Sequence, residues 1–294
     1  MSVNSKTVLV SGASGSLGGH LVSQLSDQGF AVVGLSSSPQ LGTLTALDIT
    51  DLQEVREFSD HHQFDQFIHC AARSAIGDCY NDPDTAHLVN VEGTKNLISC
   101  LKRSNPNLRS VYVSTDMVFS GDNPPYFESK EPHPLSVYGR TKLSGEGEFT
   151  LAGGDAIVRL PLMYGFSHSG KKTFFDSQYD SLRSGVPLNL FTDEWRTPVS
   201  YSLAASALIE ICQSDYKGIL HVGGNQRVSR YQFGRSLAKI LGVDETLVVA
   251  TTQQGMQFAE PRPRDLSFDT SLWRRLFPDA PNLSLEQALR EVLK

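Results

Sequence analysis

The chain has 294 residues, of which 39% are hydrophobic and 20% charged, and its formal net charge is −6. This composition is typical of a globular protein with one large or two modest domains. Because the sequence shows no basic stripe, no export signal and no apolar run of membrane-spanning length, we expect no nucleic-acid partner, no membrane association and a cytoplasmic location.

Short apolar runs alternate with amphipathic segments in the first half of the chain. Because the period of the hydrophobic pattern separates strands from helices, we expect strands at the former and helices at the latter. The predicted strands are 7–11, 30–35, 44–47, 65–70, 110–114 and 156–160. The predicted helices are 17–28, one that begins within 48–51, 85–103 and 137–149, and the stretch 120–134 is predicted to be a loop. This alternation predicts an α/β fold of the Rossmann type, with a doubly wound parallel sheet.

The pattern is less regular after residue 160. A mixed loop and helix region at 163–180, a strand at 187–191, a helix at 199–212 and a strand at 218–222 are expected there. Capping boxes that begin at Ser229 and Ser284 each start a further helix, and the first of these ends near Gly242. We expect a dinucleotide-binding domain at 1–160 and a smaller substrate-binding lobe at 161–294. The alternative that 199–222 returns to the main sheet stays open.

Gly12, Gly15 and Gly18 follow the first predicted strand and open the first helix. Gly12 allows a tight turn, Gly15 allows the backbone to approach a pyrophosphate, and Gly18 allows the helix to lie close to the sheet. An ordinary glycine-rich turn is the alternative, but the position between strand and helix favours a dinucleotide site. The expected cofactor-binding residues at this turn and after the fourth strand are Gly12, Ser14, Gly15, Ser16, Leu17, Gly18, Ala71 and Ala72.

The end of the second strand indicates which dinucleotide is bound. NAD-selective sites usually carry an acidic residue there, whereas this strand ends in serines that include Ser36 and Ser37. Their hydroxyls can donate hydrogen bonds to a 2′-phosphate, so NADP(H) is favoured, with NAD(H) as the alternative. Asp48 and Ile49 are expected at the adenine edge, although Asp48 could instead cap the next helix.

Tyr138 and Lys142 are four residues apart on a predicted helix, so they share one face. An ammonium beside a phenol favours the phenolate and is expected to lower a pKa that starts near ~10. Lys142 can also bond the nicotinamide ribose, so Tyr138 and Lys142 are expected among the cofactor-binding residues as well. Thr115 follows the fifth strand, and its hydroxyl can donate a hydrogen bond to a developing alkoxide. An exposed pair on a helix surface is the alternative for Tyr138 and Lys142. Because the glycine turn, Ala71, Ala72 and Thr115 directly follow strands of one sheet, we expect a redox site at its carboxyl edge.

The sequence resembles the extended short-chain dehydrogenases/reductases, and most of all the dTDP-4-dehydrorhamnose reductase group. The segment 113–121 resembles that group's Ser-Thr-Asp-Tyr-Val-Phe-x-Gly, and 138–146 resembles its Tyr-Gly-x-Thr-Lys-x-x-Gly-Glu helix. The segments 158–160, 164–165, 197–198 and 262–263 also fit. The resemblance implies Thr115, Tyr138 and Lys142 as the catalytic set and a nucleotide-activated 4-keto sugar as the substrate.

Two positions depart from that pattern. Met117 stands where the group usually has tyrosine, and Arg196 stands where a glycine commonly precedes Thr-Pro. Sugar-nucleotide dehydratases carry an acidic pair after the threonine, whereas Met117 follows Asp116 here, so dehydration is disfavoured. Asp116, Arg196 and Arg262 are expected at the substrate, with the two arginines as a clamp for a diphosphate. Solvated loop arginines are the alternative.

Several other residues have simpler interpretations. His69 is expected to be a satisfied core histidine. Asn90 could hold water near the site, although a surface asparagine is the simpler interpretation. Trp195 could stack on a base or sugar, or wedge the two lobes together. The cysteines follow no metal-ligand spacing, so free thiols and no metal are expected at Cys70, Cys79, Cys100 and Cys212.

Three functions compete on this evidence. The first is an NAD(P)H-dependent reductase of a nucleotide-linked 4-keto sugar, in which the nicotinamide gives hydride and Tyr138 gives the proton. The second is an epimerase or dehydrogenase of similar substrates that holds and recycles NAD. The third is a non-catalytic NADP-binding subunit, which the resemblance to the regulatory subunit of methionine adenosyltransferase implies. A homodimer is the expected assembly of the chain.

Overall fold

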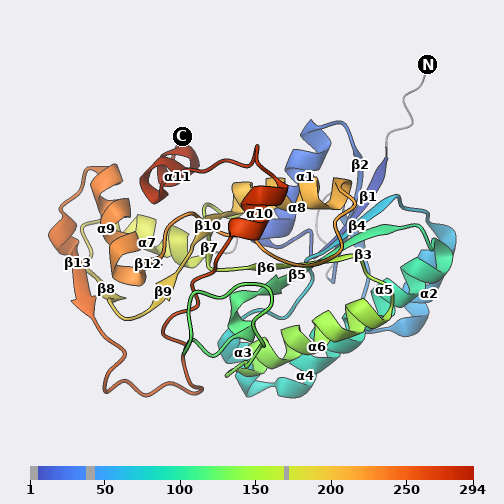
Figure 1. The fold of residues 1–294 in the computed structure, drawn as a ribbon, viewed down its shortest axis with the longest axis horizontal. Helices are drawn as coiled ribbons and strands as arrows, with labels where there is room; N and C mark the ends of the chain where they lie inside the picture. The colour runs from blue at the N-terminus through green and yellow to red at the C-terminus, as the bar shows by residue number, and fades with distance from the viewer. Residues whose placement is uncertain (1–5, 38–43, 169–171) are drawn as a thin grey trace.

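Seven parallel strands form the central sheet of the computed structural model, which describes residues 6–37, 44–168 and 172–294 (Figure 1). The strands follow the spatial order β11-β6-β5-β4-β1-β2-β3, and each neighbouring pair is parallel. Their bounds are β1 Thr7–Ser11, β2 Ala31–Ser36, β3 Leu44–Ala46, β4 Gln66–His69, β5 Arg109–Thr115, β6 Ala156–Leu160 and β11 Gly218–His221. The predicted doubly wound α/β fold is confirmed.

Helices cover both faces of this sheet (Figure 1). On one face α1 Ser16–Asp27 packs with α8 Tyr201–Gln213 in a core that includes Leu21, Leu25 and Leu208. On the other face a second core forms under α2 Leu52–His61, α5 Gly93–Ser104 and α6 Val137–Leu151. Burial on both sides explains why the strands have nearly continuous apolar sequences.

The single helix predicted over 85–103 is wrong in its detail. The structure divides this stretch into α4 Pro83–His87, a π-helical turn η1 Leu88–Glu92, and α5. A short helix that the sequence did not reveal, α3 Ile76–Asn81, precedes them. The π-helical turn carries Asn90, which is fully buried. Such turns are rare within helices and occur frequently at functional sites.

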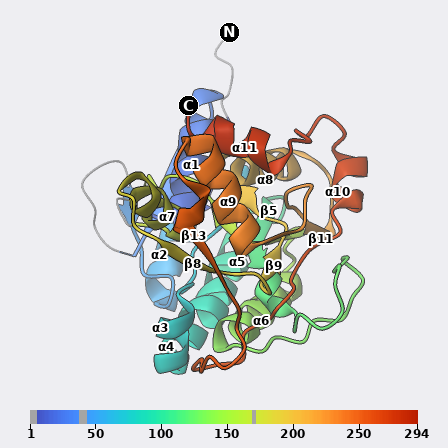
Figure 2. The same ribbon diagram turned by 90° about the vertical axis from the view of Figure 1, so that its left-hand side faces the viewer.

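A smaller lobe is built from residues after β6 (Figure 2). Its helices are α7 Phe174–Arg183, α9 Arg230–Leu241 and α11 Leu285–Val292, and its strands are β7 Met163–Tyr164, β8 Leu188–Phe191, β9 Trp195–Arg196, β10 Val199–Ser200, β12 Val228–Ser229 and β13 Val248–Thr251. The helix α10 Ser271–Leu276 instead packs on the central sheet beside β11, where Trp273 joins the core shared with α1 and α8. The 3₁₀ turns of the chain are η2 Asp116–Val118 and η3 Glu245–Leu247. Both predicted capping boxes are present, and Gly242 ends α9 with φ +66. The strand β13, the helix α10 and a third capping box at Thr173 were not predicted.

The helix and strand within 199–222 belong spatially to the central sheet. β11 pairs with β6 in parallel register from Gly218 opposite Ala156 to His221 opposite Arg159. The chain therefore leaves the central sheet after β6 and forms β7 to β10 of the small lobe. It then returns to the sheet with α8 and β11, and residues after β11 complete the small lobe. The division at residue 160 stays a prediction.

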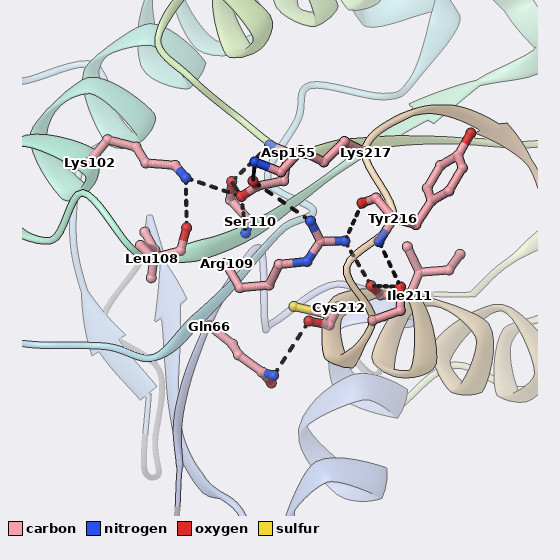
Figure 3. Close-up of polar contacts among 11 residues, drawn as sticks. Gln66, Lys102, Leu108, Arg109, Ser110, Asp155, Ile211, Cys212, Tyr216 and Lys217 are labelled. Carbon is pink, nitrogen blue, oxygen red and sulfur yellow. Dashed lines mark hydrogen bonds and ion pairs between the residues drawn. The ribbon is translucent and has the colours of Figure 1, made fainter.

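A polar cluster fastens this returning segment to the amino ends of the strands (Figure 3). Asp155 accepts hydrogen bonds from Lys102 Nζ at 3.1 Å and from the Ser110 backbone N–H at 3.0 Å. Arg109 donates from Nη2 to the carbonyl oxygens of Ile211 at 2.9 Å and Tyr216 at 2.6 Å. The cluster therefore joins α5, β5, β6 and the end of α8 at the edge opposite the carboxyl ends of the strands.

The remaining expectations about the chain concern its thiols, metals and membranes. The four cysteines are free. Within 6–37, 44–168 and 172–294, the acidic, histidine and cysteine side chains form no group that could hold a metal ion. Over the same ranges no helix is long and apolar enough to cross a bilayer.

Candidate active site

A cavity of about 1020 Å³ opens at the carboxyl ends of the central strands. It is large enough for two small ligands, since single ligand sites commonly occupy ~300–1,000 Å³. Every residue expected at the site lines it: Gly12, Ser14, Gly15, Ser16, Leu17, Gly18, Ser36, Ser37, Asp48, Ile49, Ala71, Ala72, Thr115, Asp116, Tyr138, Lys142, Arg196 and Arg262. The structure thus brings together residues that are up to 250 positions apart in the chain.

The glycine turn forms one end of this cavity. Gly12 has φ +70, and a Cβ there would lie 2.7 Å from the Ala71 backbone nitrogen, so a larger residue is sterically excluded. No side chain caps the start of α1, whose N-cap is Gly15, and the first turn carries no acidic residue. The helix therefore presents a positive N-terminus to the cavity, which fits the pyrophosphate of a dinucleotide.

The residues after β2 and β3 lie where the far end of a dinucleotide would extend. Ser36 is buried and its hydroxyl donates to Ser14 Oγ at 3.1 Å, whereas Ser37 is exposed. Asp48 does not cap α2, because Asp51 accepts from the first backbone N–H groups of that helix. Instead, Asp48 Oδ1 accepts from Thr50 N at 2.9 Å. The capping alternative for Asp48 is wrong.

Thr115, Tyr138 and Lys142 meet near the middle of the cavity. The Thr115 hydroxyl is a hydrogen-bond partner of the Tyr138 phenol and also donates to Asp116 Oδ1 at 3.2 Å. Lys142 lies one turn after Tyr138 on α6, with its Nζ 4.0 Å from the centre of the Tyr112 ring. Ser136 caps this helix by accepting from the Gly139 N–H at 3.1 Å, which fixes the turn that carries Tyr138.

Burial controls the acid–base properties of these groups. Burial raises the pKa of Tyr138 and outweighs the opposite effect of its hydrogen bond with Thr115. Burial also lowers the pKa of Lys142 to about 7, against the opposing charge of Glu146. The expectation that Lys142 lowers the pKa of the Tyr138 phenol is therefore wrong, because burial disfavours both the charged phenolate and the charged ammonium. Tyr138 is therefore protonated near pH 7.

An ion cluster of arginine and carboxylate side chains, most of them buried, lines another part of the cavity. Arg196 places Nε 3.3 Å from Asp116 Oδ2 and Nη2 3.6 Å from Glu194 Oε1, and it is 6% exposed. Arg262 donates from Nε to Glu194 Oε2 at 2.6 Å. Burial raises the pKa of Asp116 to about 6, although the Arg196 charge opposes this. Arg196 is thus not a solvated loop arginine, and both guanidinium groups are held by carboxylates.

Several functional residues escaped the sequence analysis or were placed wrongly. Glu194 and Arg230 line the same cavity, with Arg230 Nε 4.0 Å from Glu194 Oε1, but no local motif marks them. Asn90 is not on the surface: its side chain bonds the Arg73 backbone N–H at 2.7 Å and Thr141 Oγ1 at 2.9 Å. The burial of a polar residue within a helix depends on the packing of the fold, so it could not be inferred from the sequence.

His69 and Trp195 do not line the cavity. His69 is fully buried and satisfied, with Nδ1 2.6 Å from Ser11 Oγ and Nε2 2.9 Å from Thr94 Oγ1, as predicted. Trp195 does not line the main cavity, and its ring lies 3.8 Å from the Arg227 guanidinium carbon. The geometry thus gives no support to stacking of Trp195 on a ligand in this cavity.

Comparisons with known proteins agree with this geometry. A family model described as the RmlD substrate binding domain matches residues 6–294. The probable low-salt glycan biosynthesis reductase Agl14 of Haloferax volcanii is 32% identical over 270 residues, which cover 89% of each chain. Methionine adenosyltransferase 2 subunit beta of Xenopus laevis is 29% identical over 281 residues, covering 92% of this chain and 82% of that protein.

Solved structures share the fold over nearly the whole chain. dTDP-4-dehydrorhamnose reductase from Bacillus anthracis, solved in complex with NADP, has a TM-score of 0.88 at 22% identity, covering 98% of this chain and 99% of that one. A hypothetical dTDP-4-dehydrorhamnose reductase from Sulfolobus tokodaii has a TM-score of 0.82 at 28% identity, covering 96% and 98%. The same arrangement of sheet and small lobe therefore recurs in these proteins.

Proposed function

The chain belongs to the RmlD substrate binding domain family, and from this premise we propose that it is an NADPH-dependent reductase of a nucleotide-activated 4-keto sugar. The observation that carries the proposal is the meeting of Thr115, Tyr138 and Lys142 in one cavity with the glycine turn of β1 and α1. A cytoplasmic location and a homodimer belong to the same proposal.

The residues present fit a reduced nicotinamide dinucleotide. The Gly12 turn and the uncapped start of α1 would hold its pyrophosphate, and Ser14 and Ser37 would meet a 2′-phosphate without an acidic neighbour on β2. NADP(H) is therefore favoured over NAD(H). When bound, the reduced nicotinamide supplies the hydride for the carbonyl carbon.

The side chains then manage the carbonyl oxygen. The Thr115 hydroxyl, which donates to Asp116 in the free site, would turn to donate a hydrogen bond that holds this oxygen in place. Tyr138 transfers its proton to the oxygen as negative charge develops there, which converts the ketone into an alcohol. Its raised pKa keeps the proton in place until a stronger base, the alkoxide, has formed. Lys142, as an ammonium, would then stabilise the transient phenolate.

The ion cluster of the cavity favours an anion. Arg196, Arg230 and Arg262 together carry one more charge than Asp116 and Glu194, which pair with them. We propose that this excess positive charge attracts the diphosphate of a nucleotide sugar, with Arg262 closest to solvent and Asp116 closest to the sugar.

The test is NADPH oxidation with a panel of nucleoside-diphosphate 4-keto sugars. We expect Tyr138→Phe to lower kcat by at least ~10²-fold, because one positioned acid typically contributes that much, while the Kd for NADPH stays unchanged. Tyr231→Phe, outside the cavity, serves as the matched control. Full turnover by Tyr138→Phe would remove Tyr138 as the proton donor.

A second candidate function has one observation in its favour. The similarity to methionine adenosyltransferase 2 subunit beta spans 92% of the chain, so a dinucleotide-binding subunit without turnover is the rival. A wild-type protein that binds NADPH but reduces no 4-keto sugar would favour this rival. Purified protein that already carries NAD would instead favour an epimerase or dehydrogenase.

A further inference from the structure

Glu146 is a buried carboxylate that the proposed chemistry does not use. It lies one turn after Lys142 on α6, and its side chain is 5% exposed. Oε1 accepts from Ser114 Oγ at 2.5 Å and from Arg159 Nε at 2.9 Å, while Oε2 accepts from Arg159 Nη2 at 2.7 Å. Such a saturated, bidentate arrangement holds its members in one geometry.

The partners of Glu146 come from the two strands beside the reactive groups. Ser114 and Arg159 stand opposite each other in the parallel register of β5 and β6. Ser114 directly precedes Thr115, and Glu146 sits on the helix that presents Tyr138 and Lys142. One carboxylate therefore joins the end of β5 to α6 immediately behind the site.

We propose that Glu146 is a positioning residue of the reductive site, whose carboxylate clamps the Thr115 end of β5 to α6 and supplies the negative charge that keeps Lys142 an ammonium. The inference rests on the proposed function, in which Thr115 and Tyr138 share one carbonyl oxygen. Two hydroxyl groups from different elements can share that atom only if the elements keep a fixed separation, and displacement by ~1 Å can cost ~10²-fold in rate.

The charges around Lys142 support the second part of this role. The groups that face it are Cys70 and His69 at the end of β4, Tyr112 on β5 and Glu146 on α6, and Arg159 of β6 is paired with Glu146. Burial raises the pKa of Cys70 to about 12, lowers that of His69 to about 3 and raises that of Tyr112. These three groups are therefore neutral near pH 7, which leaves Glu146 as the negative charge beside Lys142, partly offset by Arg159.

Three variants test the clamp. Ser114→Ala removes only the hydrogen bond that joins β5 to the Glu146 carboxylate. We expect kcat to fall ~10-fold with the KM for NADPH unchanged. Glu146→Gln removes the charge, and we expect the high-pH limb of kcat to move down by ~1 pH unit as Lys142 loses its proton earlier. Because Glu146→Gln leaves Arg159 buried without its partner, Glu146→Gln/Arg159→Met is the variant expected to fold. It removes the guanidinium charge as well, so its limb should move less than that of Glu146→Gln, while its kcat should still fall because the link between β5 and α6 is lost.

Glu148→Gln, two residues further along α6, is the matched control and should retain the wild-type profile. A structural role alone would lower thermal stability without moving the limb. A folded Glu146→Gln/Arg159→Met protein with wild-type kcat would overturn the inference. If the wild-type enzyme reduces no 4-keto sugar, the proposed function fails instead, and ¹³C NMR titration of Lys142 still decides: an unchanged Lys142 pKa in Glu146→Gln refutes the charge role of Glu146.

Discussion

Two neighbouring serines at the end of β2 have different environments, and that difference assigns their roles. Ser36 is 4% exposed and its hydroxyl is committed to Ser14, so it shapes the wall of the cavity. Ser37 is exposed and lines the same cavity, so its side chain is accessible to a ligand. A position that faces ligand and solvent tolerates a new charge, and this makes Ser37 the residue with which to test the cofactor preference.

We expect Ser37→Asp to raise the Kd for NADPH at least ~10-fold and to leave the Kd for NADH nearly unchanged. The added carboxylate would repel the 2′-phosphate, which NADH lacks, and salt would weaken this effect. Fluorescence titration of both cofactors measures it. Ser144→Asp adds the same charge on an exposed part of α6 outside the cavity and should change neither Kd. Equal losses for both cofactors would contradict a 2′-phosphate at Ser37.

At the scale of elements, the cluster around Asp155 is the main polar fastening of the sheet's amino edge (Figure 3). Asp155 has a side chain that is 8% exposed, and it pairs with Lys102 at 3.1 Å, Lys217 at 3.2 Å and Arg109 at 3.7 Å. Burial by itself raises the pKa of Asp155, but hydrogen bonds from Lys102 and Ser110 and the nearby cations lower it overall. The native state therefore favours the ionised carboxylate.

We expect Asp155→Asn to reduce the free energy of unfolding by about 2 kcal/mol at pH 7, because it leaves partly buried cations without their partner. Since the folded pKa of Asp155 is depressed, its contribution is complete above the unfolded pKa of ~3.9 and is lost as pH falls through the folded pKa. Urea unfolding should thus show a smaller difference between wild type and variant at pH 3 than at pH 7.

Asp60→Asn is the matched control for this measurement. Asp60 pairs with Arg103 at 3.0 Å, but both side chains are more than half exposed. Exposed pairs contribute ~0–1 kcal/mol, so little change is expected at either pH. If Asp155→Asn cost the same at both pH values, the ionised carboxylate would not be the stabilising species.

The whole molecule is tied together by chain segments that cross between the lobes. The α8 helix shares its core with α1, and β11 completes the edge of the sheet beside β6. Ser16 at the start of α1 lies 2.8 Å from Ser167 between their hydroxyl oxygens, and Gln24 donates to the Ser202 carbonyl at 3.0 Å. The cofactor end of the cavity is therefore built on a sheet that residues after 160 complete.

We expect a fragment of residues 1–160 to lack a cooperative unfolding transition, because it would expose the face of α1 and the sheet that α8 covers. A fragment of residues 1–222 restores α8 and β11, which supply most of the core residues that 1–160 lacks, and should show such a transition even without Trp273 of α10. Differential scanning calorimetry and ¹⁵N NMR spectra of both fragments measure this. Cooperative unfolding of 1–160 alone would instead establish a domain boundary at residue 160.

The sequence alone determined the strands of the first half of the chain, the glycine turn and the placement of Thr115 at the same edge of the sheet. These follow from local periodicity and from the rule that the carboxyl ends of parallel strands share an edge, so neighbouring residues suffice to infer them. The similarity of the chain to the extended short-chain dehydrogenases/reductases, read from motifs of a few residues, is confirmed for the same reason.

Only the tertiary structure decided how burial and long-range pairing modify those residues. The pKa of Tyr138 is raised rather than lowered because the surrounding elements exclude water. Arg196 is held by Asp116, 80 residues earlier, and Asn90 is buried because a π-helical turn aims it at Arg73 and Thr141. Such features depend on contacts between distant segments and on solvent exclusion, neither of which leaves a periodic trace in the sequence.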